Sequence, residues 1–413
     1  MVRTRFPTLL AVFLTATLAV ATGLAPGAAA RSHPPITTLT LPPPSGPRAI
    51  GTVSLHLVDP GRPDPYVASV PNRELMISLW YPTRSSDRHP RAPWLPAAAA
   101  DRYLRANGVS PDRVSLGLTH GRMGAPVARG GNRLPVVVYS PGANASRAYG
   151  TGVVEELASR GYLVVTIDHT YDAGVVEFPG GRVAVPAHEV DDFAKAVAVR
   201  TADTRFVLDR LGDLAAGRNP DAERAALPEG LAGAPDLDRI GMFGHSLGGA
   251  TTSATMLADP RIKAGAGLDG AALGPVVEAG LDRPYLVVDT LRKGGMAGNP
   301  ALRAFWSHLR GWRLELTVAG AAHQSFGDDA VLLPLLAPHL NLSRCTLESL
   351  VGSIPTARAT AFQRAYPVAF FEQHLRGRGH LLDAPSPRFP EVTHNRDPYP
   401  AAPSEVEPEQ PCP

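Results

Sequence analysis

The chain has 413 residues, of which 44% are hydrophobic, so it is long enough and apolar enough to bury a large core. Its 40 basic and 38 acidic residues leave a formal net charge of only +2, which excludes a strongly basic surface for nucleic acid or for an acidic membrane. We therefore expect neither a nucleic-acid partner nor a stable membrane anchor, although transient contact with a lipid surface is compatible with this composition. We also expect a monomer.

The first 30 residues have the three parts of a secretory signal. Arg3 and Arg5 precede an apolar run over residues 9–20, and small residues ending at Ala30 follow. This order is typical of a cleaved signal peptide. Threonine, glycine and proline interrupt the run before it reaches the roughly 20 apolar residues that a membrane-spanning helix needs. We therefore expect a signal peptide over residues 1–30 and a secreted, extracellular protein.

The next segments carry few signals of regular structure. Residues 31–50 are rich in proline and threonine and predict an extended leader, whereas residues 73–82 alternate like a strand of a sheet. Proline, arginine and glycine crowd residues 82–132. This composition predicts a long irregular connection with one short helix near residues 97–106.

A regular alternation of strands and helices begins at residue 134. Residues 134–140 are apolar on both faces, as expected of a strand inside a parallel sheet. A helix at 151–159 and a second apolar strand at 162–168 complete a parallel crossover unit. Residues 186–211 have the apolar spacing of a long helix. Later strands are expected from residue 240 and at residues 264–268, 285–289 and 314–318, before a closing helix at residues 359–376.

Residues 244–248, with the sequence Gly-His-Ser-Leu-Gly, form the most informative motif of the chain. They follow a strand-like segment and precede a helix-compatible one, which is the context of a nucleophile elbow with Ser246 at its tip. The two glycines let the strand and the helix pass closely. A chain this rich in glycine produces the pattern by chance on the order of 0.2 times. Assigning a function therefore requires a catalytic base and an acid that could act with Ser246.

A serine hydroxyl needs a base at neutral pH, and a third group must orient that base. In this architecture the acid and the histidine follow the serine, at the ends of later strands. His323 lies in a loop directly after the strand at 314–318, whereas the other histidines after Ser246 lie in expected helices or in the tail. We therefore predict His323 as the general base.

Two aspartates can serve as the acid. Asp269 follows the strand at 264–268, and Asp289 ends the strand at 285–289. Either carboxylate could orient an imidazole at this edge of the sheet. On these residues alone, both assignments stay open.

The alternation of elements predicts an α/β fold with a mostly parallel central sheet flanked by helices, and the nucleophile elbow is typical of the α/β-hydrolase fold. We expect one such domain over residues 51–400, followed by a tail at residues 401–413. Cys345 and Cys412 are the only cysteines. In an exported chain an even number of cysteines favours a disulfide, which here would pin the tail.

Three segments resemble, in order and at similar intervals, the catalytic segments of the plasma-type, serine-dependent platelet-activating-factor acetylhydrolases. They are the elbow around Ser246, Leu268-Asp269-Gly270, and the sequence His-Gln-Ser-Phe-Gly-Asp that starts at His323. The similarity extends over about residues 70–380. In that family the acid lies on the strand just after that of the nucleophile. The resemblance therefore implies Asp269, rather than Asp289, as the acid.

The loop after residue 140 also resembles the oxyanion loop of that family, with one departure. The family usually has a histidine before the loop glycine, and this chain has Pro141. Proline has no backbone N–H, but the required donor lies further along the loop. Alignment with the family loop implies that the backbone N–H groups of Ala143 and Leu247 hold the oxyanion.

The sequence therefore predicts a secreted serine esterase that works through an acyl-enzyme on small-molecule or lipid esters, without a cofactor or metal. The resemblance implies short acyl chains, such as the acetyl ester of a phospholipid or of a simple soluble ester. The acidic run at residues 188–192 is better explained by the dipole of a helix start than by metal binding. Two alternatives are a secreted lipase or polyester hydrolase with Asp289 as the acid, and a non-catalytic binding protein that keeps the elbow as a relic.

Overall fold

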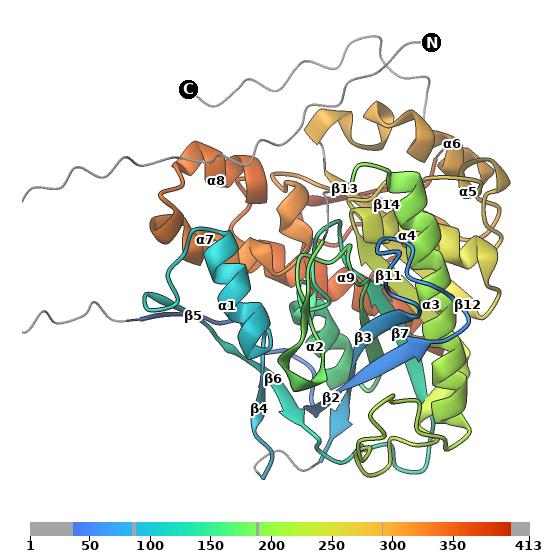
Figure 1. The fold of residues 1–413 in the computed structure, drawn as a ribbon. Helices are drawn as coiled ribbons and strands as arrows, with labels where there is room; N and C mark the ends of the chain where they lie inside the picture. The colour runs from blue at the N-terminus through green and yellow to red at the C-terminus, as the bar shows by residue number, and fades with distance from the viewer. Residues whose placement is uncertain (1–35, 85–87, 187–189, 291, 398–413) are drawn as a thin grey trace, which may run out of the picture. The chain divides into compact units, whose positions relative to one another are not determined.

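A computed structural model describes residues 36–84, 88–186, 190–290 and 292–397. The expected signal peptide, the tail and Cys412 lie outside these residues, so the secretory signal and the disulfide stay predictions. From Ile36 onward the described residues belong to one compact unit (Figure 1).

An 11-stranded sheet forms the centre of the fold (Figure 1). Its six middle strands run parallel and include the strands that the sequence predicted from residue 134 onward, whereas the strand predicted at residues 73–82 is the antiparallel β3 (Arg73–Thr83). The six parallel strands are, in order across the sheet, β14 (Arg313–Val318), β13 (Tyr285–Thr290), β12 (Ile262–Leu268), β11 (Pro235–His245), β7 (Leu134–Ser140) and β8 (Leu163–Asp168). On one side the antiparallel β15 (Val392–Asn395) follows β14. On the other side β8 is followed by β3, β2 (Ala49–Asp59), β6 (Leu118–Met123) and β4 (Arg91–Pro93).

Helices cover both faces of this sheet. On one face, α2 (Thr151–Ser159) and α9 (Thr356–Arg376) share a core cluster with Val137 and Tyr139 of β7. On the other face, the alternate residues Val136 and Val138 share a cluster with α3, α4 and α6. The bounds of these three helices are Phe193–Ala215, Leu247–Ala258 and Pro300–His308. Because both faces of β7 are buried, its sequence is apolar without interruption, and the predicted parallel sheet flanked by helices is confirmed.

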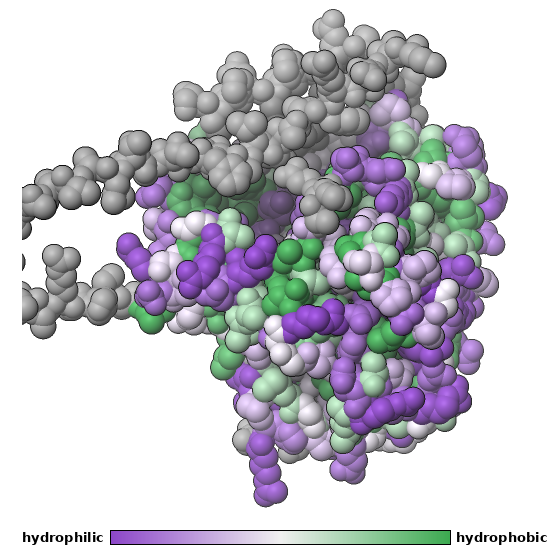
Figure 2. Space-filling view, in the orientation of Figure 1, coloured by the Kyte–Doolittle hydropathy of each residue, from purple (hydrophilic) through white to green (hydrophobic). Residues whose placement is uncertain are grey.

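The other described α-helices and strands do not belong to the central sheet. The helices among them are α1 (Ala97–Ala106), α5 (Val276–Ala279), α7 (Asp329–Leu340) and α8 (Arg344–Val351). The strands among them are β1 (Thr37–Leu39), β5 (Val114–Leu116), β9 (Val176–Glu177) and β10 (Val183–Ala184). None of the helices in the described part of the chain is both long and apolar enough to cross a membrane. Figure 2 shows hydrophilic and hydrophobic residues interspersed over the face that it presents.

Two sequence predictions need correction. The helix expected over residues 186–211 begins only at Phe193, because the carboxylate of Asp192 accepts the backbone N–H of Lys195 and caps it there. The connection at residues 82–132 contains the predicted α1, but it also contains β4, β5 and β6. These strands pair with each other or with β1 and β2, which lie far away in sequence. Their hydrogen bonds come from distant partners, so local composition does not reveal them.

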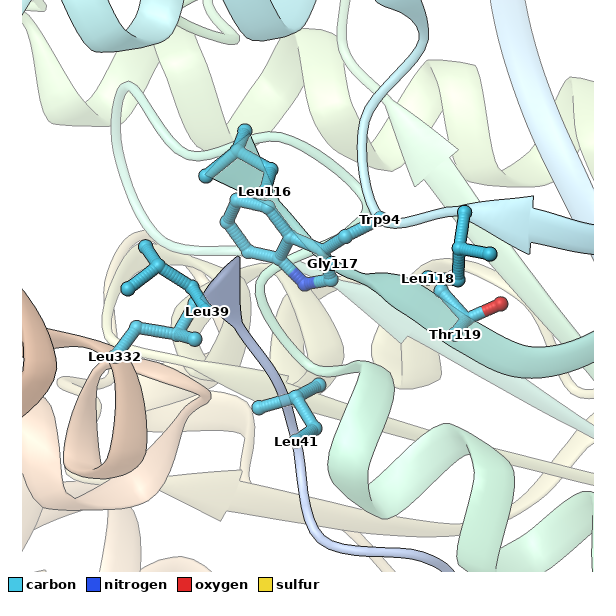
Figure 3. A pocket seen from close by; sticks show the side chains of 8 residues that line it. All are labelled: Leu39, Leu41, Trp94, Leu116, Gly117, Leu118, Thr119 and Leu332. Atoms are coloured by element: carbon cyan, nitrogen blue, oxygen red, sulfur yellow. The ribbon is translucent and has the colours of Figure 1, made fainter. Parts of the chain in front are cut away.

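The end of the proline-rich leader is part of the fold. Its strand β1 pairs in parallel with β5, and Leu39 lies beside Trp94 and Leu332 around a small apolar hollow (Figure 3). The Trp94 indole N–H donates to Asp328 at 3.0 Å, which joins this region to the start of α7. The described part of the leader is thus packed against the domain.

Candidate active site

Ser246 is the single residue between β11 and α4. Its φ of 55° and ψ of −121° are rarely adopted by residues other than glycine. The Ser246 N–H donates to the carbonyl of Leu268 at 2.9 Å, and the Ser246 carbonyl accepts the N–H of Gly249 at 2.9 Å. The structure thus has the strand, the strained turn and the helix that a nucleophile elbow requires. The serine itself is only half-buried.

The two glycines of the motif are required by close backbone contacts. A Cβ atom on Gly244 would lie 2.2 Å from the carbonyl carbon of Gly248, where strand and helix pass each other. A Cβ atom on Gly248 would lie 1.9 Å from the carbonyl oxygen of Ser140 at the end of β7. Neither clash can be relieved without moving the backbone, so the turn depends on both glycines.

His323 and Asp269 come together from different strands. Asp269 directly follows β12, the neighbour of β11, and its N–H donates to the carbonyl of Val288 at 2.7 Å. His323 begins the short 3₁₀ helix η3 (His323–Phe326) after β14, and its Nδ1 donates to the Asp269 carboxylate. The imidazole side chain is 45% exposed, whereas the carboxylate is only 13% exposed. A protected carboxylate therefore orients an imidazole that substrate can reach.

A second histidine holds His323 beside the elbow. The ring centroids of His245 and His323 are 4.6 Å apart, and His245 Nε2 donates to the carbonyl of His323 at 2.8 Å. Burial, reinforced by the charge of His323, lowers the pKa of His245 to about 3, so His245 is neutral at pH 7. Since His245 immediately precedes Ser246, these contacts bring the predicted base, its acid and the predicted nucleophile to one edge of the sheet.

Asp289, the other predicted acid, lies behind Asp269. Burial, then the hydrogen bond with Asp269 and its charge, raises the pKa of Asp289 to about 8. Burial opposes ionisation of Asp269 as well, but the hydrogen bond and charge of His323 outweigh it and lower the Asp269 pKa. At neutral pH the pair therefore holds one carboxylate, Asp269, and one carboxylic acid, Asp289, that donates to it. The contacts favour Asp269 as the partner of His323.

The two predicted oxyanion donors belong to the start of α4 and to the loop after β7. Leu247 is the first residue of α4, where backbone N–H groups have no acceptor within the helix. Ala143 lies in the loop after β7 and packs into a small apolar cluster that also contains Leu247. A Cβ atom on Gly142 would lie 3.4 Å from the Cβ of Ser246, so this loop runs against the serine.

The sequence analysis missed a buried arginine behind this loop. Arg200 of α3 is fully buried, donates to both carboxylate oxygens of Asp172, and donates to the backbone carbonyls of Pro141 and Gly142. An arginine on the apolar face of a predicted helix was the available signal, since a buried guanidinium must have partners.

A further buried histidine near the loop after β7 is hydrogen-bonded to other side chains. His169 is fully buried between Ser140 and Asp203, at 3.0 Å from each. In the described part of the chain, no group of histidine, cysteine, aspartate or glutamate is arranged to hold a metal ion. Residues 188 and 189, the first two of the acidic run considered above, lie outside that part.

Comparison with known proteins gives consistent matches. The chain matches the family described as platelet-activating factor acetylhydrolase, isoform II, over residues 38–178 and 194–377. It is 30% identical, over 85% of its length and 92% of the relative's, to a probable 1-alkyl-2-acetylglycerophosphocholine esterase of Arthroderma benhamiae. It is 24% identical to the platelet-activating factor acetylhydrolase of Bos taurus, over 74% of this chain and 72% of that protein. A solved structure of a ferulic acid esterase from Streptomyces cinnamoneus superposes with a TM-score of 0.71 and 36% identity, covering 87% of this chain and 99% of that one.

Proposed function

The chain belongs to the platelet-activating factor acetylhydrolase, isoform II, family of carboxylic ester hydrolases, and from this premise we propose that it is a secreted serine esterase acting on short-chain esters. The observation that carries the proposal is the position of His323. Its Nδ1 donates to Asp269, and its ring packs on the residue that precedes Ser246. This is the support that a serine nucleophile needs from a base and an acid.

In the proposed reaction, His323 Nε2 takes the Ser246 hydroxyl proton as Oγ attacks the ester carbonyl carbon. The carbonyl π electrons move onto oxygen, and the N–H groups of Ala143 and Leu247 stabilise the oxyanion. The imidazolium, held by Asp269, then gives its proton to the departing alkoxide as the carbon–oxygen bond breaks. Water, deprotonated by His323, attacks the acyl-enzyme in the same way, and the acid product and free Ser246 Oγ–H result.

The choice of substrate rests on the relatives. Two of them are named for hydrolysis of the acetyl ester of an ether phospholipid, which supports an acetyl group as the acyl part. The ferulic acid esterase supports a second candidate, an ester of a hydroxycinnamic acid, because it is more similar in sequence and almost its whole length is covered. Both candidates use the same reaction and differ in the acyl group that the site accepts.

A chain-length series tests the proposal and separates the candidates. We would measure kcat/KM for p-nitrophenyl acetate, butyrate and palmitate, for methyl ferulate, and for an acetylated ether phospholipid. The proposal expects acetate to be cleaved best among the p-nitrophenyl esters and palmitate to be cleaved poorly. A preference for palmitate would instead support a lipase, and a preference for methyl ferulate would support the second candidate.

The serine mechanism has its own test. Ser246→Ala removes the nucleophile and is expected to lower kcat by about 10⁶-fold, to the background of the remaining site. Activity of this variant within tenfold of the wild type would disprove the mechanism. Wild-type protein without activity on any of these esters would support a non-catalytic binding protein.

A further inference from the structure

We propose that Arg200 is a positioning residue that aims the backbone N–H of Ala143 at the oxyanion. The inference rests on the proposed function for the identity of the nucleophile, Ser246, and it adds a residue whose side chain is separated from substrate by the loop that it holds.

The Arg200 guanidinium joins two segments behind the oxyanion loop. Its Nε and Nη2 donate to the two carboxylate oxygens of Asp172 at 2.6 and 2.5 Å. Its Nη1 donates to the carbonyl of Pro141, and its Nη2 donates to the carbonyl of Gly142 at 2.9 Å. Both Arg200 and Asp172 are fully buried. The buried charges compensate each other, and two of the three remaining guanidinium hydrogens are directed to successive backbone carbonyls of the loop.

The direction of one carbonyl fixes the direction of the next N–H. No cis peptide bond occurs among the described residues, so the Gly142 C=O and the Ala143 N–H belong to one trans peptide plane and point in opposite directions. Arg200 binds the Gly142 oxygen on the α3 side of the loop. The Ala143 N–H must therefore point away from α3. The close approach of Gly142 to Ser246 puts this peptide next to the reacting serine.

The far end of the loop is also anchored to the segment that carries Asp172. Asn144 has a φ of 58°, and its carbonyl accepts the N–H of Gly174 at 2.9 Å. The loop is thus held by three backbone carbonyls around Ala143: Arg200 binds those of Pro141 and Gly142, and Gly174 binds that of Asn144. Ala143 is the residue between these anchors, and its N–H is the group that the anchors orient.

Replacing Arg200 with lysine is the direct test. Lysine keeps the positive charge beside Asp172, but its single ammonium lacks the planar fork that reaches a carboxylate and two carbonyls together. We expect kcat for p-nitrophenyl acetate to fall by about 10²-fold, the loss seen when an oxyanion donor is removed. We expect KM to change by less than about threefold, since the donor acts in the transition state. The affinity for a phenylboronic acid, whose serine adduct is tetrahedral, should fall by a similar factor to kcat.

Arg283→Lys is the matched control. Arg283 also donates to backbone carbonyls, those of Met256, Asp259 and Ile262, but these lie at the other end of α4 from Ser246. This variant loses the same fork and is expected to keep wild-type kcat and boronate affinity. A kcat loss in Arg200→Lys without a matching loss of boronate affinity would overturn the inference, as would unchanged kcat in a folded Arg200→Lys protein.

A crystal structure of the wild-type phenylboronate adduct keeps the inference testable if the variant does not fold. We expect the Ala143 nitrogen within about 3.1 Å of an adduct oxygen while Gly142 keeps its hydrogen bond to Arg200. An Ala143 N–H turned away from the adduct would overturn the role of Arg200 and leave the serine mechanism intact. Wild-type-level activity of Ser246→Ala would instead defeat the proposed function itself.

Discussion

Of the six non-glycine residues with a positive φ in the described part of the chain, three lie at the nucleophile elbow, directly after β12 and in the loop after β7. Ser246, Asp269 and Asn144 are not glycines, yet they have φ values of 55°, 46° and 58°. Conformations of this kind cost on the order of 1–3 kcal/mol each and persist only where the surrounding structure holds them. Here the Ser246 and Asp269 N–H groups are held by the carbonyls of Leu268 and Val288.

Ser246→Gly should therefore stabilise the protein while it inactivates the enzyme. Glycine adopts the same φ and ψ without steric cost, so we expect the free energy of unfolding to rise by about 1 kcal/mol, measured by urea denaturation. Ser246→Ala removes the same hydroxyl but keeps a Cβ atom, so it serves as the control and is expected to show no such gain. Equal stability of the two variants would argue against strain at this position.

Replacing Asp269 or Asp289 with asparagine should affect kcat very differently. Asp269→Asn removes the carboxylate that orients His323, and we expect kcat to fall by about 10³- to 10⁴-fold. Asp289→Asn replaces a protonated acid with an amide that can still donate to Asp269, so kcat should stay within about fivefold of the wild type. Steady-state rates on p-nitrophenyl acetate would check both. The opposite pattern would make Asp289 the acid.

The raised pKa of Asp289 also predicts how stability depends on pH. The folded protein keeps this proton up to about pH 8, whereas the unfolded chain loses it near pH 4. The contribution to stability is thus complete below about pH 4 and is lost as the pH rises to about 8. Asp289→Asn removes this loss, so its stability relative to the wild type should increase by about 1 kcal/mol per pH unit in that range. Thermal unfolding of both proteins from pH 4 to pH 8 would measure the difference, and a constant difference would contradict it.

At the scale of the elements, the elbow depends on the passage of α4 past β7. Gly248→Ala would put a Cβ atom 1.9 Å from the Ser140 oxygen, so α4 must move. We expect a loss of stability of several kcal/mol and a fall in kcat of at least about 10²-fold, because Ser246 moves with the helix. Urea denaturation and steady-state rates would measure both.

Gly212→Ala is the control for this substitution. Gly212 lies inside α3, and no atom lies within 4 Å of the position that its Cβ would take. We expect this variant to be more stable by about 0.5–1 kcal/mol with unchanged kcat, since alanine favours a helix. Similar behaviour of the two variants would show that the contact with Ser140 does not govern the elbow.

The elements that could be predicted are those whose signal is local. β7, β8 and the motif around Ser246 carry apolar runs and glycines that follow directly from their burial and close packing. β5 and β6 were missed, because their hydrogen bonds come from β1 and β2. In the site, His323 could be found by its place after a strand. Arg200 could not be assigned a role, because its contacts with the loop join residues 59 and 58 positions apart.

At the scale of the whole molecule, the proposed export predicts where the mature protein is found and at which residue it begins. Expressed with its own amino terminus in a secreting host, the chain should appear in the medium and begin at or near Arg31, as determined by terminal sequencing and intact mass. A Cys345–Cys412 disulfide predicts that neither cysteine reacts with iodoacetamide under denaturing conditions until a reductant is added. Retention of the full chain in the cell would contradict the signal peptide, and two reactive thiols would contradict the disulfide.

Strands that are adjacent in the sheet are often far apart in the sequence. The proposed site residues follow four different strands: Ala143 follows β7, Ser246 follows β11, Asp269 follows β12 and His323 follows β14. Helix α9 comes later in the chain than all of them, and its Phe371 packs against Gly241 of β11. During synthesis, the site therefore has no base until about four-fifths of the chain has been made, and its core is incomplete until α9 follows. If the proposed triad is correct, ester hydrolysis is consequently withheld from nascent chains and from products truncated before α9.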